Sequence, residues 1–216
     1  MRRLIAGVML GWVALNATAA MAADESIFGT HWVKFQPIQV GGSLPGCELV
    51  FLAVTADRVY LNGNQVVVNG SVVLRGSDKG LGLTLKVGLK DITLGTPFER
   101  PAFAYLQTAS VSMAKARHQS FDGDDGYKVF VYSATDVTAL EMLKELTSNN
   151  KIAIGFNRKI GGIDVLVPLD LMVIDSEYTA NQKVLRKHSP DSVLGFADCT
   201  VKIIDEFLGK KNESSG

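Results

Sequence analysis

A strict alternation of apolar with small or polar residues, found in two separate segments, limits the fold more than any other feature. Every odd position is apolar in residues 81–89 (Leu-Gly-Leu-Thr-Leu-Lys-Val-Gly-Leu), and the same holds for residues 163–173. Successive side chains of a β-strand point to opposite faces, so this period indicates strands with one face on a core. We therefore expect a mainly β protein, built as a single antiparallel β-sandwich or curved barrel. Pro168 lacks an N–H, which places its strand at an edge or beside a bulge.

Other segments support this β-rich interpretation. Apolar or β-branched runs predict further strands at residues 31–38, 47–54, 103–113, 127–133 and 152–156. Asn62-Gly63 and Asn69-Gly70 are hairpin signals, because both residue types tolerate positive φ. They lie too close together for both to end long strands, so one of them is expected to be a bulge. The polar segment 175–187 has no predicted structure.

Two amphipathic helices are expected to interrupt the strands, at about residues 136–148 and 190–208. In the first, Val137, Leu140, Leu143 and Leu146 recur at helical spacing after Asp136, a residue type that caps helix N-termini. The second begins with Ser189-Pro190-Asp191, a cap followed by a proline and an acid in the first turn. Residues 23–210 are interpreted as a single β-rich domain, with a flexible polar tail at 211–216.

The N-terminal segment has the composition of a secretory signal peptide. Met1-Arg2-Arg3 precedes an apolar run over 4–15, and Ala20-Met21-Ala22 forms a cleavage site. The run is shorter than the roughly 20 residues that span a bilayer, and no later run is longer. We therefore expect removal of residues 1–22, export to a bacterial periplasm or the medium, and no transmembrane segment in the mature chain.

Charge and cysteine content restrict the partners and suggest one covalent link. The chain has 22 basic and 22 acidic residues, so loss of Arg2 and Arg3 leaves it weakly negative. This charge argues against a nucleic-acid or anionic-membrane partner, and favours a protein or another envelope component. Cys47 and Cys199 are the only cysteines, and in an oxidising compartment we expect them to form a disulfide. The alternative is a pair of buried free thiols.

Few residues suggest catalytic or metal chemistry. Asp122, Asp124 and Asp125 lie on a glycine-containing turn and are candidate ligands for a hard cation such as Ca²⁺, although Asp-Gly turns also form hairpins without a ligand. The histidines His31, His118 and His188 are scattered, and no nucleophile motif is present. We therefore predict no catalytic residue and no cofactor. The alternative is a secreted hydrolase or metal-dependent enzyme that uses His118 with the Asp122–Asp125 turn.

Two basic clusters are expected to be solvated surface. The first contains Lys115, Arg117 and His118, and the second contains Lys183, Arg186, Lys187 and His188. Charged edges of this kind are common on exposed strands. The segment Asn157–Gly162 is the best candidate for a protruding loop, which an inhibitor of another enzyme would need.

The order of elements in residues 137–169 resembles the C-terminal part of invasion-associated locus B-like proteins, which are exported bacterial proteins. The resemblance lies in a leucine-rich helix at 137–146, an apolar strand at 151–156, and the segment from Gly162 to Pro168-Leu169. That family usually carries more cysteines along its sheet. The resemblance implies a periplasmic β-sandwich with no defined catalytic site, engaged in envelope or host interaction. Together with export and the absence of catalytic motifs, it favours a non-enzymatic binding or envelope-interaction module.

Overall fold

The fold is mainly β, with two helices, as the alternation predicts. A computed structural model describes residues 26–40, 43–77, 80–180 and 183–213. The predicted cleavage site at Ala20-Met21-Ala22 lies outside these residues. In chain order the elements are β1 (Gly29–Val40), β2 (Ser43–Asp57), β3 (Asn64–Ser77), β4 (Gly80–Asp91), β5 (Phe103–Gln107), β6 (His118–Asp122), β7 (Tyr127–Ser133), α1 (Val137–Ser148), β8 (Lys151–Asn157), β9 (Val165–Asp170), β10 (Val173–Tyr178), β11 (Val184–His188) and α2 (Asp191–Glu213).

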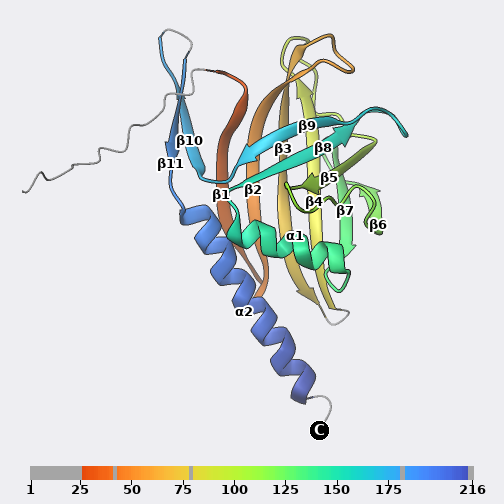
Figure 1. The fold of residues 1–216 in the computed structure, drawn as a ribbon, viewed down its shortest axis with the longest axis vertical. Helices are drawn as coiled ribbons and strands as arrows, with labels where there is room; N and C mark the ends of the chain where they lie inside the picture. The colour runs from red at the N-terminus through yellow and green to blue at the C-terminus, as the bar shows by residue number, and fades with distance from the viewer. Residues whose placement is uncertain (1–25, 41–42, 78–79, 181–182, 214–216) are drawn as a thin grey trace, which may run out of the picture.

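A large antiparallel sheet forms the first layer. Its six strands have the order β1-β2-β3-β4-β7-β6, so β1 and β6 are its two edges (Figure 1). The sheet is open, and of the two predicted architectures the sandwich-like one is therefore confirmed. In β4 the odd-numbered Leu83, Leu85, Val87 and Leu89 are buried, as their alternation predicts.

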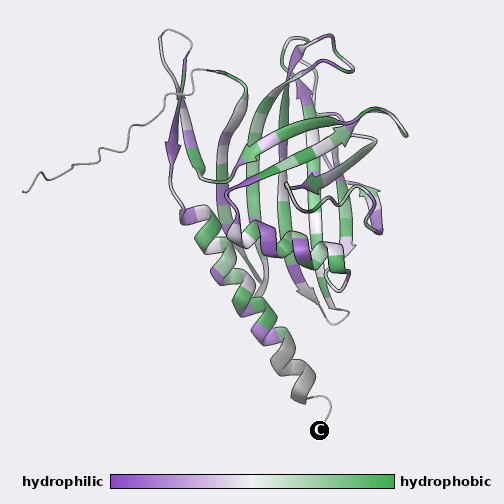
Figure 2. Ribbon diagram, viewed as in Figure 1, coloured by the Kyte–Doolittle hydropathy of each residue, from purple (hydrophilic) through white to green (hydrophobic). Residues whose placement is uncertain are grey.

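The second layer covers one face of this sheet. It consists of a three-stranded sheet of order β5-β8-β9 together with α1 and α2 (Figure 1). Figure 2 shows apolar residues along the strands and on the helices where these layers meet. The shared core contains Phe51, Phe130, Phe156 and Phe196, one from each of four elements. Pro168 lies on β9, which is an edge strand, as predicted.

Both helices begin where the sequence indicates. The Asp136 carboxylate accepts hydrogen bonds from the backbone N–H groups of Thr138 and Ala139 and so caps α1. The Ser189 hydroxyl accepts from the N–H of Asp191 at the start of α2. Helix α2 continues to Glu213, three residues into the segment predicted to be a tail. Among the residues that the structure describes, neither helix is long and apolar enough to cross a bilayer.

A disulfide joins the two layers. Cys47 on β2 and Cys199 on α2 are bonded, with a Cα–Cα distance of 5.9 Å and a sequence separation of 152. Both side chains are buried. The predicted cysteine pairing is therefore confirmed, and it fixes α2 to the large sheet.

The strands differ from the sequence-based expectations at several places. The polar segment 175–187, to which the sequence assigned no element, contributes to the paired strands β10 and β11. The strand predicted over 103–113 ends at Gln107, because the Thr108 hydroxyl accepts from the N–H groups of Ser110 and Val111 and closes a turn. Asn69-Gly70 is neither a turn nor a bulge but lies within β3, whereas Asn62-Gly63 has positive φ at both residues and forms the turn.

Candidate functional site

The acidic turn that carries the candidate cation ligands is a hairpin turn. Gly123 donates to the Tyr127 carbonyl, and the turn uses positive φ at Asp125 and Gly126. Asp122 lies 3.9 Å from Arg100 in an exposed ion pair. Within the described residues, no group of three or more His, Cys, Asp or Glu side chains is placed to hold a metal ion. Asp122, Asp124 and Asp125 therefore do not converge on one.

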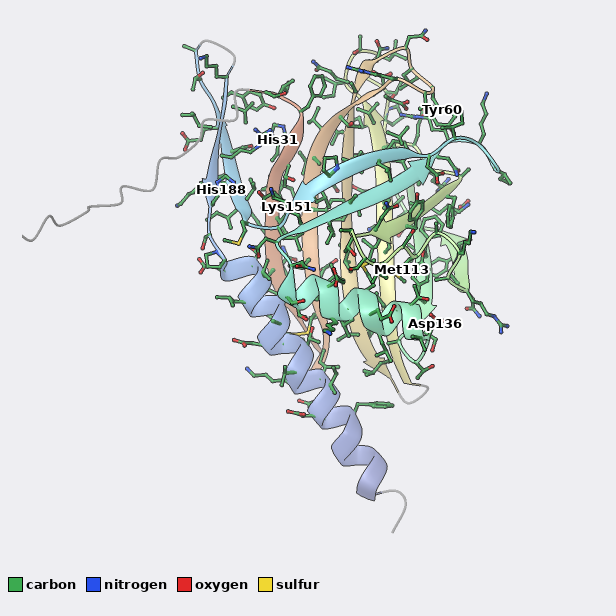
Figure 3. The ribbon with its side chains drawn as sticks, viewed as in Figure 1. His31, Tyr60, Met113, Asp136, Lys151 and His188 are labelled. Atoms are coloured by element: carbon green, nitrogen blue, oxygen red, sulfur yellow. A yellow bond between two sulfur atoms is a disulfide. The ribbon has the colours of Figure 1, made fainter. Side chains whose placement is uncertain are left out.

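The three histidines do not share a pocket. His31 lies on β1 and His118 on β6, the opposite edges of a six-stranded sheet. Five strand spacings separate these edges, which corresponds to roughly 24 Å. Figure 3 places His31 and His188 on the side of the β10–β11 hairpin, far from Asp136, which lines the His118 cavity. The enzymatic alternative receives no support from a shared histidine site.

His118 lies beside a cavity of about 720 Å³, lined also by Arg117, Gln119, Ser133 and Asp136. The His118 ring is not part of a solvated rim. It is half-buried among aromatic rings, with centroid distances of 5.3 to 5.7 Å, and its Nδ1 lies 3.0 Å from the Ala116 carbonyl oxygen. The Ser133 hydroxyl bonds to Thr135, and Asp136 caps α1, so neither is hydrogen-bonded to His118. Among the described residues that line the cavity, no nucleophile is hydrogen-bonded to a base.

The second basic cluster is only partly solvated. Arg186 is buried, contrary to the prediction, and it binds the segment that leads into β1. Its guanidinium donates to the backbone carbonyls of Ser26, Phe28 and Thr30 at 2.6 to 3.0 Å. Lys183, Lys187 and His188 are exposed. The role of Arg186 is therefore to hold the N-terminal part of the domain on the β10–β11 hairpin.

The most distinctive surface lies where three connecting segments meet, which we call the loop end. It comprises residues 58–63 between β2 and β3, 92–102 between β4 and β5, and 158–164 between β8 and β9. Two contacts bring the first and third segments together: Arg158 pairs with Asp57, and the Tyr60 hydroxyl donates to the Ile163 carbonyl at 2.6 Å. Figure 3 shows Tyr60 beside the tip of the β8–β9 hairpin.

A partly buried ionic network forms the base of the loop end. Arg158 Nε lies 2.9 Å from Asp57 Oδ2, and Arg158 Nη1 lies 3.1 Å from Glu99 Oε2. The Asp57 side chain is fully buried, and its other oxygen accepts from the N–H groups of Val59 and Tyr60. A buried carboxylate needs such compensation, because desolvation strongly disfavours an unpaired charge. The network therefore fixes all three segments.

Unpartnered polar atoms are concentrated at the same place. Five buried side-chain nitrogen or oxygen atoms in the described part of the chain have no hydrogen-bond partner. Four of the five belong to the loop end or to residues bordering it: Asp91 Oδ2, Thr96 Oγ1, Asn157 Oδ1 and Arg158 Nη2. Buried polar groups are usually satisfied, so this concentration distinguishes the loop end from the rest of the fold.

Exposed apolar side chains form the rim of the loop end. They are Val59, Ile92, Leu94, Ile160 and Ile163. Ile160 is 96% exposed, Ile163 73% and Leu94 66%. Other exposed apolar residues lie on α1, on α2, on strands or near the β10–β11 hairpin, and no other group of loops in the described part of the chain carries as many. Exposed apolar side chains gathered on neighbouring loops are candidates for an interaction site.

The sequence indicated only one part of this surface. The segment Asn157–Gly162 was predicted as a protruding loop, and Lys159, Ile160 and Gly161 are exposed. Asn157 is buried, however, and Arg158 belongs to the ionic network. In the other two segments of the loop end, the exposed apolar residues are isolated and show no periodicity. The sequence alone therefore did not indicate that they belong to one surface.

No protein-family model, curated protein or solved structure matches the chain. The described residues form a two-layered, disulfide-linked β protein with exposed apolar side chains on loops joined by ion pairs and hydrogen bonds.

Proposed function

We propose that this protein is an exported, non-enzymatic binding module that engages an envelope component through its loop end. The observation that carries the proposal is the gathering of five exposed apolar side chains on three segments joined by the Asp57–Arg158–Glu99 network. Burying such side chains against a partner would be favourable, at about 25 cal/mol per Å² of apolar surface. A network of this kind also keeps the segments in place before binding, which lowers the ordering cost.

Three further observations support the export and binding parts of the proposal. The Cys47–Cys199 disulfide suits an oxidising compartment. The N-terminal residues have the composition of a signal peptide. The resemblance of residues 137–169 to invasion-associated locus B-like proteins implies envelope or host interaction as well.

Hydrogen-exchange footprinting would test this function. The mature, oxidised protein is incubated with isolated bacterial envelope membranes or without them, and backbone exchange is compared by segment. We expect slower exchange in 58–63, 92–96 and 158–164, with little change on the exposed face of α2. Protection confined to another surface, or no protection at all, would contradict the proposal. An Ile160→Ser/Ile163→Ser double variant should abolish the protection.

A further inference from the structure

The shape and charge of the loop end identify a class of partner. Resting on the proposed function, we propose that the loop end binds the surface of an anionic phospholipid bilayer, with its apolar side chains inserted among the headgroups. Three features point to this partner: the protrusion of these side chains, the connections between the segments and the position of two exposed cations. This mode of binding lies at the membrane surface and needs no membrane-spanning helix.

The apolar side chains protrude rather than line a hollow. Ile160 lies at the tip of the β8–β9 connection, beside Gly161, whose φ of 70° turns the chain back. A side chain that is 96% exposed has almost no protein around it. A protein partner would need a matching depression for each protruding residue, whereas the interfacial region of a bilayer is fluid and adapts to the inserted groups.

The connections between the segments allow several side chains to insert together. Tyr60 links the β2–β3 and β8–β9 connections through its bond to the Ile163 carbonyl. In the β4–β5 connection, Asp91 accepts from the N–H of Leu94, and Ile92 donates to the Gln65 carbonyl at the start of β3. Because these bonds already order the backbone, insertion does not have to order it. Tyr60, with an apolar ring and a polar hydroxyl, is also a residue type that favours membrane interfaces.

Two cations flank the apolar tips. Arg58 precedes Val59, Lys159 precedes Ile160, and both cations are exposed. Neither forms an ion pair with any residue that the structure describes. Their long side chains can extend toward phosphate groups while the neighbouring apolar residues insert. Although the mature chain is weakly negative as a whole, the charges next to these tips are positive and complement an anionic surface.

The carboxylates of the loop end have partners other than Arg58 and Lys159. Asp57 and Glu99 pair with Arg158, and Asp91 is buried beneath the loops. The exposed Asp164 accepts hydrogen bonds from Tyr105 and Asn157 at the root of the β8–β9 connection.

Vesicle flotation tests the proposal directly. The mature, oxidised protein is mixed with vesicles of phosphatidylcholine, or of equal parts phosphatidylcholine and phosphatidylglycerol, in the absence of any other protein. We expect the wild type to float with the anionic vesicles, and its bound fraction to fall as salt increases. Ile160→Ser/Ile163→Ser should lower the partition coefficient at least tenfold, and Arg58→Gln/Lys159→Gln about fivefold for each cation removed.

A matched control uses exposed apolar residues on another surface. Leu194 and Val201 on α2 are 56% and 57% exposed, so Leu194→Ser/Val201→Ser should float like the wild type. Failure of the wild type to bind anionic vesicles, or equal binding by the loop variants, would overturn the proposal. If the loop end is protected by envelope membranes but not by pure lipid, the partner is an envelope protein or glycolipid. The lipid inference then fails, while the proposed function stands.

Discussion

Arg158 and Asp57 form an ion pair at 2.9 Å, although 101 positions separate them in the chain. Arg158 follows β8 in the second layer, and Asp57 ends β2 in the large sheet. The pair therefore fixes the distance between the two layers at the end where the three loops meet. Because Arg158 also contacts Glu99, one guanidinium orders the roots of all three segments.

Replacing Arg158 should destabilise the protein strongly. Arg158→Ala leaves the fully buried Asp57 carboxylate without its charge partner, and breaking a buried pair in this way costs about 3 to 5 kcal/mol. Urea unfolding of the oxidised protein, read from tryptophan fluorescence, measures this loss. The exposed Arg58 is the matched control, and Arg58→Ala should change the unfolding free energy by less than about 0.5 kcal/mol. Equal effects of the two variants would show that the Asp57 pair does not stabilise the fold.

Gly155 should not tolerate a side chain. It pairs with Tyr105 across β5 and β8, and a Cβ at this position would overlap the Tyr105 ring. Gly155→Ala should displace the ring, weaken the Tyr105–Asp164 hydrogen bond, and cost about 1 to 3 kcal/mol in unfolding free energy. Gly82 is the matched control, because its Cβ would meet only ordinary contacts. A Gly155→Ala variant as stable as Gly82→Ala would contradict this packing.

Loss of the disulfide should remove a large part of the stability. The Cys47–Cys199 link closes a separation of 152 residues, and the chain-entropy model gives about 5 kcal/mol for a closure of this size. The measurement is the urea midpoint of Cys47→Ala/Cys199→Ala against the oxidised wild type. Reduced wild type should behave like the double variant. A loss below about 1 kcal/mol would mean that the reduced, unfolded chain is already compact.

Much of the fold was predictable because its signals are local. The alternation in 81–89 fixes both β4 and its buried face, and Asp136 and Ser189 each mark a helix start. The bounds of helix α1 were predicted correctly, but the prediction of its buried face was only partly right. Val137 and Leu140 are exposed, while Ala139 and Met142 are buried, because a neighbouring stripe of the helix packs into the hydrophobic core.

The loop end was not predictable, because the contacts that join its three segments are between residues far apart in the sequence. Arg158, Asp57 and Glu99 are far apart in the sequence, and only the pairing of β8 and the folding of 92–102 along β4 bring them together. Strand β6 was missed for a related reason. It is an edge strand whose residues are mostly exposed, so no buried face imposes an apolar alternation. The acidic turn left two interpretations open in the sequence, because carboxylates and glycines serve both cation loops and hairpins.

His31 should make the stability depend on pH. The side chain is buried, with Nε2 bonded to the Ile27 carbonyl and Nδ1 to the Ser176 hydroxyl. Burial is the main cause that lowers the pKa of His31 below its ordinary 6.5, and the nearby Arg186 charge lowers it further, against the Ile27 hydrogen bond. The folded protein therefore binds a proton at His31 less readily than the unfolded chain does.

The sign of this dependence follows from the lowered pKa. The unfolding free energy is at its full value above about pH 6.5, and it falls as the pH decreases toward the folded pKa of His31, since the unfolded state then binds more protons. Urea unfolding at several values between about pH 7.5 and 5.5 measures the slope. At about pH 7.5 the His31→Gln variant should be less stable than the wild type, and its unfolding free energy should depend less steeply on pH. The exposed His188 is the control, and His188→Gln should keep the slope of the wild type. An unchanged slope in His31→Gln would show that other groups cause the acid sensitivity.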